Sequence, residues 1–253
     1  MSRKILAFPN QHGAWAFLIV PLILGACLGA ATWLGLVFAI TWVTAYPVSY
    51  FGGRGLLMRI RRGTFTAKTR TEFRHALPWA IVTVVGAVTL VLARPWIVVP
   101  GAGVAAIWSI SLWLTWIGRE RGITNDLLLT VLASIAAPFM WAVANDEPRI
   151  GAIPQTMWLA ALLCLLFFAG SVLHIKSLIR EADDRRWHWA SVGFHAMALV
   201  IAVAISWWLA IPFVAALART ILIRPGLRPG QLGAVETVVS VLLVVCTVLA
   251  LAP

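Results

Sequence analysis

Long apolar runs alternate with short polar gaps along the whole of this 253-residue chain. Nine of the runs approach the ~20 residues that an α-helix needs to cross a hydrocarbon core of about 30 Å. The pattern therefore predicts an all-α, polytopic transmembrane bundle that forms a single domain over residues 1–253. The expected spans are 12–30, 32–50, 77–93, 96–117, 126–143, 156–175, 187–205, 207–222 and 234–251.

The basic residues fall on alternate gaps. Of the 20 Lys and Arg residues, only Arg94 and Arg149 lie in the other set of gaps. Because basic loops next to membrane helices stay in the cytoplasm, the N-terminus is expected to be cytosolic. The cytosolic loops are then 51–75, 118–125, 176–186 and 223–233, and the basic residues on that side are Arg3, Lys4, Arg54, Arg59, Arg61, Arg62, Lys68, Arg70, Arg74, Arg119, Arg121, Lys176, Arg180, Arg185, Arg186, Arg219, Arg224 and Arg228.

The composition supports a membrane protein. The chain is 61% hydrophobic and 11% charged, whereas a soluble domain has about 25% charged residues. The net charge of +11 does not indicate a nucleic-acid partner, because no soluble basic module carries it. The charge lies in short loops beside apolar runs, so the expected partners of the protein are membrane lipids. Cys27, Cys164 and Cys246 are far apart and each lies within an apolar run, so we interpret them as small core residues rather than a disulfide or a metal site.

The gap at 51–75, FGGRGLLMRIRRGTFTAKTRTEFRH, is longer than the others. Its apolar residues alternate with arginines between Arg54 and Arg62, a pattern that suits a short helix lying on anionic lipid. A solvated basic loop is the plainer interpretation. A third alternative is a lid over a cytosolic cavity that recognises phosphate, since loops of this length are uncommon without a role.

Ionisable and polar side chains gather at the expected cytosolic ends of the helices. Such groups are costly at membrane depth and therefore mark candidate sites. A functional role is not the only interpretation. The histidines can be hydrogen-bonded structural residues, and Asp126 and Glu236 can cap the helices that they begin. The candidate polar site comprises His12, Tyr46, Asn125, Asp126, His174, Lys176, Arg180, His195 and Glu236.

Lys176 and Arg180 lie four residues apart and share one face of an expected helix. Two such cations can clamp a phosphate or diphosphate, and Arg54 and Arg224 are further candidates for binding an anion. The alternatives are that the two cations extend toward lipid headgroups, or that one of them pairs with Asp126. No paired carboxylates with the spacing of a metal site are present, and no catalytic residue is identified.

Four segments together resemble the YwiC-like family of bacterial membrane proteins. They are PNQHGAWAF (Pro9–Phe17), RERGITNDL (Arg119–Leu127), GSVLHIKSLIREADDRRWHWASVGFH (Gly170–His195) and RPGQLGAVE (Arg228–Glu236). The resemblance implies a multi-pass protein of the bacterial cytoplasmic membrane and no settled activity.

The order of helices is also similar, more remotely, to the UbiA-type prenyltransferases. That resemblance implies nine helices and cytosolic chemistry at two aspartate-rich motifs, which follow the second and sixth helices. The equivalent segments here are Tyr46–Arg62 and His174–Arg185. The first has no aspartate, the nearest acid after it is Glu72, and His174 stands where the second motif would have an aspartate. Magnesium, which the resemblance implies as cofactor, therefore lacks its usual ligands in this sequence.

Three functions remain open at this point. The first is a UbiA-like binder or transferase of an isoprenoid, a quinone or another lipid, with its polar head at the cytosolic mouth. The second is a non-catalytic subunit or assembly factor of a larger membrane complex. The third is a small-solute transporter, which the absence of an evident mid-membrane charge and of an inverted repeat disfavours.

Overall fold

The computed structural model describes residues 7–9, 12–119, 122–223, 226 and 229–252, and within these ranges the chain is helical without strands. Seven helical segments are long and apolar enough to cross a membrane. Two shorter apolar segments, Ala14–Ala30 and Trp207–Leu222, occupy the first and eighth expected spans. The predicted all-α transmembrane bundle is therefore confirmed.

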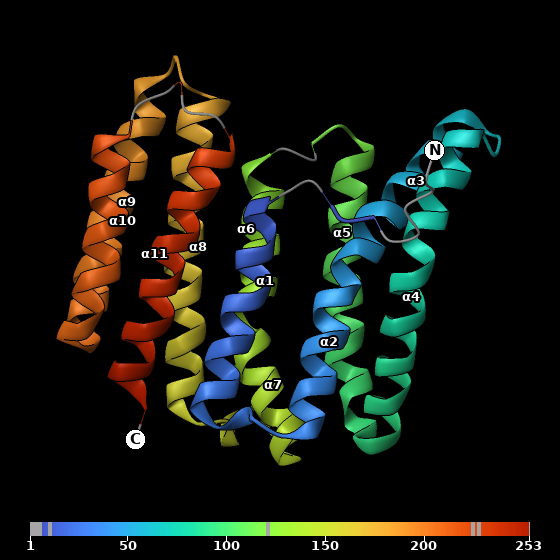
Figure 1. Ribbon diagram of the computed structural model, residues 1–253, viewed down its shortest axis with the longest axis horizontal. Helices are drawn as coiled ribbons and strands as arrows, with labels where there is room; N and C mark the ends of the chain where they lie inside the picture. Colours follow the sequence, from blue (N-terminus) through green and yellow to red (C-terminus); the bar gives the residue numbers. More distant parts are fainter. Residues whose placement is uncertain (1–6, 10–11, 120–121, 224–225, 227–228, 253) are drawn as a thin grey trace.

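The helices follow the chain as Figure 1 labels them. Short π- or 3-10 turns (η) extend several of them. Their bounds are α1 His12–Gly25, η1 Ala26–Ala30, α2 Trp33–Pro47, η2 Val48–Gly52, α3 Gly53–Arg62, α4 Ala67–Ala93, η3 Pro95–Ile97, α5 Val98–Trp116, α6 Ile123–Ser134, α7 Ala136–Asn145, η4 Ile150–Ala152, α8 Gln155–Ile179, α9 Arg185–Ile205, η5 Trp207–Leu209, α10 Ala210–Leu222 and α11 Pro229–Leu251.

The long helices run side by side, with α9, α10 and α11 on one side of the bundle and α4 on the other (Figure 1). Among the seven long segments α8 is the most enclosed. In its most apolar stretch of 18 residues 61% of the residues are buried, against 11% for Pro95–Trp116. α1 packs against α6, α7, α8 and α11. One apolar core surrounds Phe167, Phe168 and Phe213, and a second surrounds Leu34 and Phe38. α8 and α1 thus form the centre of the molecule.

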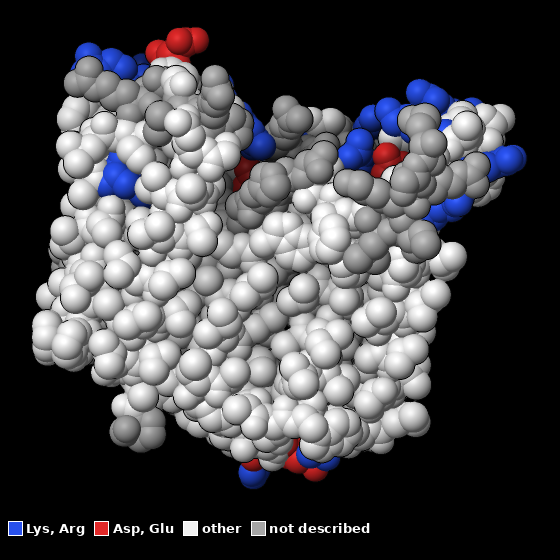
Figure 2. Space-filling model, viewed as in Figure 1, with Lys and Arg blue, Asp and Glu red and all other residues white. Residues whose placement is uncertain are grey.

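Charged side chains gather at one end of the bundle, which we call the basic end (Figure 2). Figure 2 also shows that this end is hollowed between the α8–α11 side and the α3–α4 side. Arg94 and Arg149 lie at the opposite end, and each pairs with an acid, Asp146 and Glu147 respectively. The apolar face seen in Figure 2 between the two ends carries almost no charge, as a lipid-facing surface requires.

Two expectations from the sequence need correction. The segment 51–75 is not mainly a loop. Of the alternatives for its Arg54–Arg62 stretch a helix is observed, since α3 continues from α2 through η2, and α4 begins at Ala67 rather than near residue 77. Gly63, with φ 68°, makes the turn between them, and the Thr66 hydroxyl accepts a bond from the Thr69 amide at the start of α4. The apolar run stops where the charged residues begin, so hydropathy alone places the end of the helix there. The helix itself continues, because its backbone hydrogen bonds do not depend on the polarity of the side chains. Cys27 is exposed, whereas Cys164 and Cys246 are buried as expected.

A break separates α6 from α7 within one expected span. Ile135 interrupts the helix three residues before Pro138. Because proline has no amide hydrogen, Pro138 cannot donate to the carbonyl of Ser134, which is the last residue of α6. The proline therefore accounts for the break near the middle of this span.

Candidate functional site

A buried ion pair joins the last two helices to the central one. The Arg219 guanidinium on α10 forms an ion pair with the Glu236 carboxylate on α11, and its other terminal nitrogen donates to the Ser171 hydroxyl on α8 at 2.9 Å. Ser171 in turn donates to Glu236 at 2.8 Å. The side chains of Arg219 and Glu236 are only 4% and 12% exposed. Three helices therefore meet at one charged, hydrogen-bonded site.

This site extends to two histidines. His195 on α9 donates from Nδ1 to the Ser191 carbonyl at 2.8 Å, and its Nε2 lies 3.4 Å from the Thr220 hydroxyl. The ring of His174 on α8 lies edge-on to that of His195, with 6.4 Å between centroids. We call the whole set the α8 cluster, comprising Ser171, His174, His195, Arg219, Thr220 and Glu236.

His174 is the unusual member of the α8 cluster. It is 1% exposed, and neither ring nitrogen has a hydrogen-bond partner among the described residues. A buried polar group without a partner costs about 1–3 kcal/mol.

Gly170 on α8 makes room for His195 on α9, since a Cβ at Gly170 would lie 2.8 Å from Nε2 of His195. The close approach of α8 and α9 thus depends on this glycine.

The cations predicted to clamp a phosphate are bound to different carboxylates. Arg180 donates to Asp126 on α6 at 3.1 Å. The Lys176 ammonium lies 3.9 Å from Glu181 and 5.1 Å from the centre of the Trp187 ring. Asp126 lies in the first turn of α6, where a carboxylate complements the helix dipole, and it also pairs with Arg180; Gly122 is the N-cap of α6. A phosphate bound by Lys176 and Arg180 together would compete with both carboxylates.

A second polar group, which we call the α2–α4 cluster, lies on the other side of the basic end. Arg54 on α3 donates to the Tyr50 hydroxyl at 2.8 Å and lies 3.8 Å from Glu72 on α4. The Tyr46 ring packs edge-on against Trp15 of α1, with 5.2 Å between centroids. The α2–α4 cluster therefore comprises Tyr46, Tyr50, Arg54 and Glu72.

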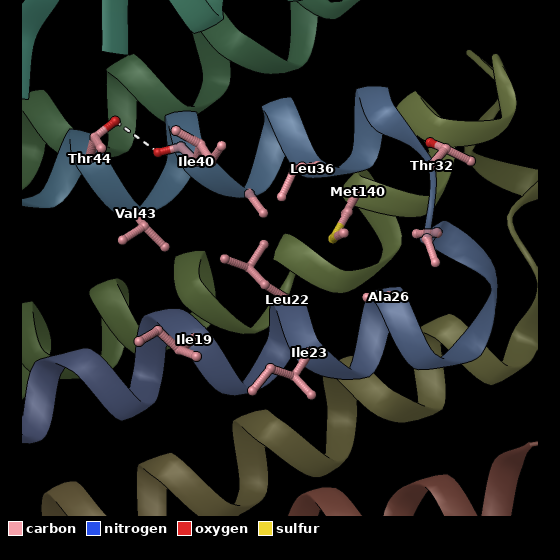
Figure 3. A pocket seen from close by; sticks show the side chains of 13 residues that line it. Ile19, Leu22, Ile23, Ala26, Thr32, Leu36, Ile40, Val43, Thr44 and Met140 are labelled. Atoms are coloured by element: carbon pink, nitrogen blue, oxygen red, sulfur yellow. Dashed lines mark hydrogen bonds between the residues drawn. The ribbon is translucent and has the colours of Figure 1, made fainter. Parts of the chain in front are cut away.

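An apolar groove of about 590 Å³ lies between α1 and α2, with Met140 of α7 behind it (Figure 3). This volume is within the usual range for a ligand site. The wall is aliphatic except for Thr32 and Thr44, and the Thr44 hydroxyl is already bonded to the Ile40 carbonyl at 2.8 Å. Ile23 and Leu36 are exposed along its rim, so the groove opens toward the surrounding lipid.

The structure divides the predicted polar site. The α8 cluster contains His174, His195 and Glu236, whereas Tyr46 belongs to the α2–α4 cluster with Arg54. Asn125 is buried beside the Asp126–Arg180 pair, while the side chain of His12 and all of Arg224 lie outside the described residues. Sequence reasoning missed Ser171, Arg219 and Thr220 as members of a site.

Sequence reasoning missed Arg219 because it resembles any other basic residue at the end of a helix. One signal was available: Arg219 precedes Glu236 across a single short connection, so the two antiparallel helices were free to bring them together.

Among the residues that the structure describes, no group of three His, Cys, Asp or Glu side chains lies close enough to hold a metal ion.

These features define a polytopic helical membrane protein with a buried polar cluster near its basic end. The chain belongs to the YwiC-like family, whose model, described as YwiC-like protein, matches residues 8–141. A Haemophilus influenzae protein titled "Uncharacterized protein" is 27% identical over 96% of this chain and 99% of its own length. The Bacillus subtilis "Uncharacterized protein YwiC" is 24% identical over 75% of this chain and 74% of its own. No solved structure matches the chain.

Proposed function

We propose that this protein is a binder or transferase of an amphipathic lipid of the isoprenoid or quinone type in the bacterial cytoplasmic membrane. The observation that carries the proposal is that the α2–α4 cluster begins two residues after the last groove-lining residue of α2. The groove follows α2 from Thr32 to Thr44, about 18 Å at 1.5 Å per residue. Tyr46 follows two residues later, and Tyr50 one further turn toward the basic end.

The groove and the α2–α4 cluster would divide the ligand between them. Moving an apolar tail from lipid into an apolar groove gains little hydrophobic free energy, because lipid tails are as apolar as leucine. Selectivity therefore depends on the shape of the groove and on hydrogen bonds to the head. The Tyr50 hydroxyl and the Arg54 guanidinium supply donors for a carbonyl, hydroxyl or phosphate oxygen.

Binding has more support than magnesium-dependent transfer. Glu72, Asp126 and Glu236 lie on three different helices, and each is paired with an arginine. A magnesium-bound diphosphate usually needs carboxylates that converge on the metal. The transferase form of the proposal thus requires chemistry other than that of the UbiA aspartate motifs.

The test is native mass spectrometry of the full chain, extracted in mild detergent and supplied with a ubiquinone or menaquinone. Ala39→Trp fills the groove and should abolish retention of the lipid. Val200→Trp is the matched control, since it places the same ring on an exposed face of α9 and should retain the lipid. Equal retention by both variants would overturn the groove assignment. Stoichiometric co-purification of another protein without lipid would favour the alternative of a complex subunit.

The buried Arg219–Glu236 pair favours a second candidate, a small-solute transporter. Charged groups held inside a bundle commonly mark ion or proton pathways. Uptake into proteoliposomes that is driven by a pH gradient and lost in Glu236→Gln would support this candidate. A tight vesicle population that shows no uptake of any tested ion or small solute would count against it.

A further inference from the structure

Two helices are longer than the membrane requires. The continuous segment Trp33–Arg62 has 30 residues and α4 has 27, or about 45 Å and 40 Å at 1.5 Å per residue. A hydrocarbon core is about 30 Å thick, and each headgroup layer adds roughly 5–8 Å. The excess of about 10–15 Å therefore carries α3 and the first turns of α4 into and just beyond the headgroup layer at the basic end.

We call this part, residues 53–74, the basic hairpin. It carries Glu72 as its acid and seven cations, namely Arg54, Arg59, Arg61, Arg62, Lys68, Arg70 and Arg74. Figure 2 shows blue side chains projecting at this corner of the molecule. Within the described residues, Arg54 alone of the seven lies within 4.0 Å of a carboxylate. Most of this positive charge is thus not balanced by carboxylates of the described residues.

Contacts with the bundle fix the hairpin in place. Arg61 donates to the carbonyls of Thr115 and Trp116 at 3.3 and 3.0 Å, which caps the end of α5. Gly55 is buried against the Phe73 ring, so that α3 lies close to α4. The two arms of the hairpin therefore pack against each other, and Arg61 attaches the hairpin to α5.

Apolar side chains are exposed on the same surface. Leu56 and Ile60 lie one turn apart on α3 and are 41% and 52% exposed, and Phe65 in the turn is 54% exposed. The Arg59 guanidinium lies over the Phe65 ring at 4.9 Å. Exposed aliphatic groups between arginines are typical of helices that lie at the boundary between headgroups and acyl chains.

We propose that the basic hairpin is a binding site for anionic phospholipid headgroups in the adjacent leaflet. The unbalanced cations would bind the phosphates, and Leu56, Ile60 and Phe65 would enter the outer part of the acyl region. Lipid binding here would anchor α2, which forms one wall of the α1–α2 groove, and α4, which packs against α2. Arg54 and Glu72 belong to the α2–α4 cluster, and the headgroup site consists of the other six cations. The proposal therefore holds whether or not the groove takes a ligand.

The test uses the full chain in nanodiscs of phosphatidylcholine containing about one third phosphatidylglycerol, with bound lipids counted by native mass spectrometry. Arg62→Gln/Arg70→Gln should weaken phosphatidylglycerol retention by about fivefold for each cation removed. Arg185→Gln/Arg186→Gln is the matched control. Neither arginine lies within 4.0 Å of a carboxylate among the described residues, but Glu181, Asp183 and Asp184 lie beside them in the sequence, so the net charge of this segment is close to zero. The control should remain within about twofold of the parent chain.

A second variant, Leu56→Ser/Ile60→Ser, tests the apolar contribution and should also lower retention while the charge is unchanged. Circular dichroism confirms that each variant keeps its helices. Equal phosphatidylglycerol retention by the parent and the Arg62/Arg70 variant would overturn the proposal, as would an equal loss in the Arg185/Arg186 control. Unchanged lipid retention with loss of a bound acidic protein would show that the hairpin serves a protein partner instead.

Discussion

Arg219 and Glu236 form an ion pair inside the bundle, and Ser171 of α8 holds both of them by hydrogen bonds. Arg219 also lies over the Phe167 ring, 5.5 Å from its centre. The pair joins α10 to α11 and both to α8, and the two side chains are only 4% and 12% exposed. Removing one charge would leave the other buried without compensation, which is the costly event in such pairs.

A double-mutant cycle on this pair should be strongly non-additive. Arg219→Met or Glu236→Met alone should lower the free energy of unfolding by about 3–5 kcal/mol, because each leaves one unpaired charge. Arg219→Met/Glu236→Met should recover most of that loss, giving a coupling free energy of about 2 kcal/mol or more. Unfolding in mixed micelles by increasing SDS measures all four species. Additive losses would show that the two side chains act independently.

At Gly170 the backbone of α8 lies close to the ring of His195 on α9. Gly170→Ala should destabilise the protein by about 1–3 kcal/mol, because the added Cβ would lie 2.8 Å from Nε2 of His195. His195→Ala removes that ring, so the same glycine substitution should cost much less in the His195→Ala background. Gly193→Ala on α9 is the control, since no atom lies within 4 Å of its added Cβ. The same micelle assay would contradict this interpretation if the cost were equal in both backgrounds.

The fold was predictable because lipid imposes a simple rule. Every backbone polar group in the hydrocarbon core must be bonded within the protein, so apolar runs of about 20 residues become helices. The expected spans at 156–175 and 187–205 correspond to α8 and α9. The rule gives no information beyond the hydrocarbon. For that reason the sequence leaves a helix and a loop as alternatives for 54–62, and it does not predict the first turns of α4.

The candidate site was predictable only in part. His174, His195 and Glu236 could be selected because polar groups within apolar runs are unusual. Arg219 could not be selected in the same way, because it lies at a helix end where basic residues are common. Its role depends on which helix packs beside α10, and hydropathy does not encode the packing of neighbouring helices.

Cysteine labelling should distinguish the three native thiols. Cys27 is exposed near the end of α1, whereas Cys164 and Cys246 are buried. A small membrane-permeant maleimide should therefore modify one thiol in the folded protein and three after denaturation, as counted by intact-mass spectrometry. Cys27→Ser should remove the fast-reacting thiol and leave the other two protected. Rapid modification of Cys164 would contradict the packing of α8.

The orientation in the membrane can be tested with one cysteine at each end. In a background without native cysteines, Thr64→Cys in the exposed turn of the basic hairpin should be accessible only from the cytosol. Ile150→Cys, which is exposed at the opposite end, should react from outside the cell. A membrane-impermeant maleimide applied to intact cells and to inverted vesicles measures both. Labelling of Thr64→Cys in intact cells would reverse the orientation expected from the positive-inside rule.

Glu147 and Arg149 give a prediction about pH at the opposite end. Arg149 donates to both carboxylate oxygens of Glu147, from Nε at 2.8 Å and from a terminal nitrogen at 2.9 Å, and these bonds lower the pKa of Glu147 from 4.5 to about 2. A lowered pKa in the folded state means that the stabilising contribution is present above pH ~4.5 and is lost as the pH falls toward 2. The stability difference between the parent chain and Glu147→Gln should therefore be constant from pH 8 to 5 and shrink between about pH 4.5 and 2. Arg149→Gln should remove the same pH dependence, and a difference that persists at pH 2 would refute the assignment.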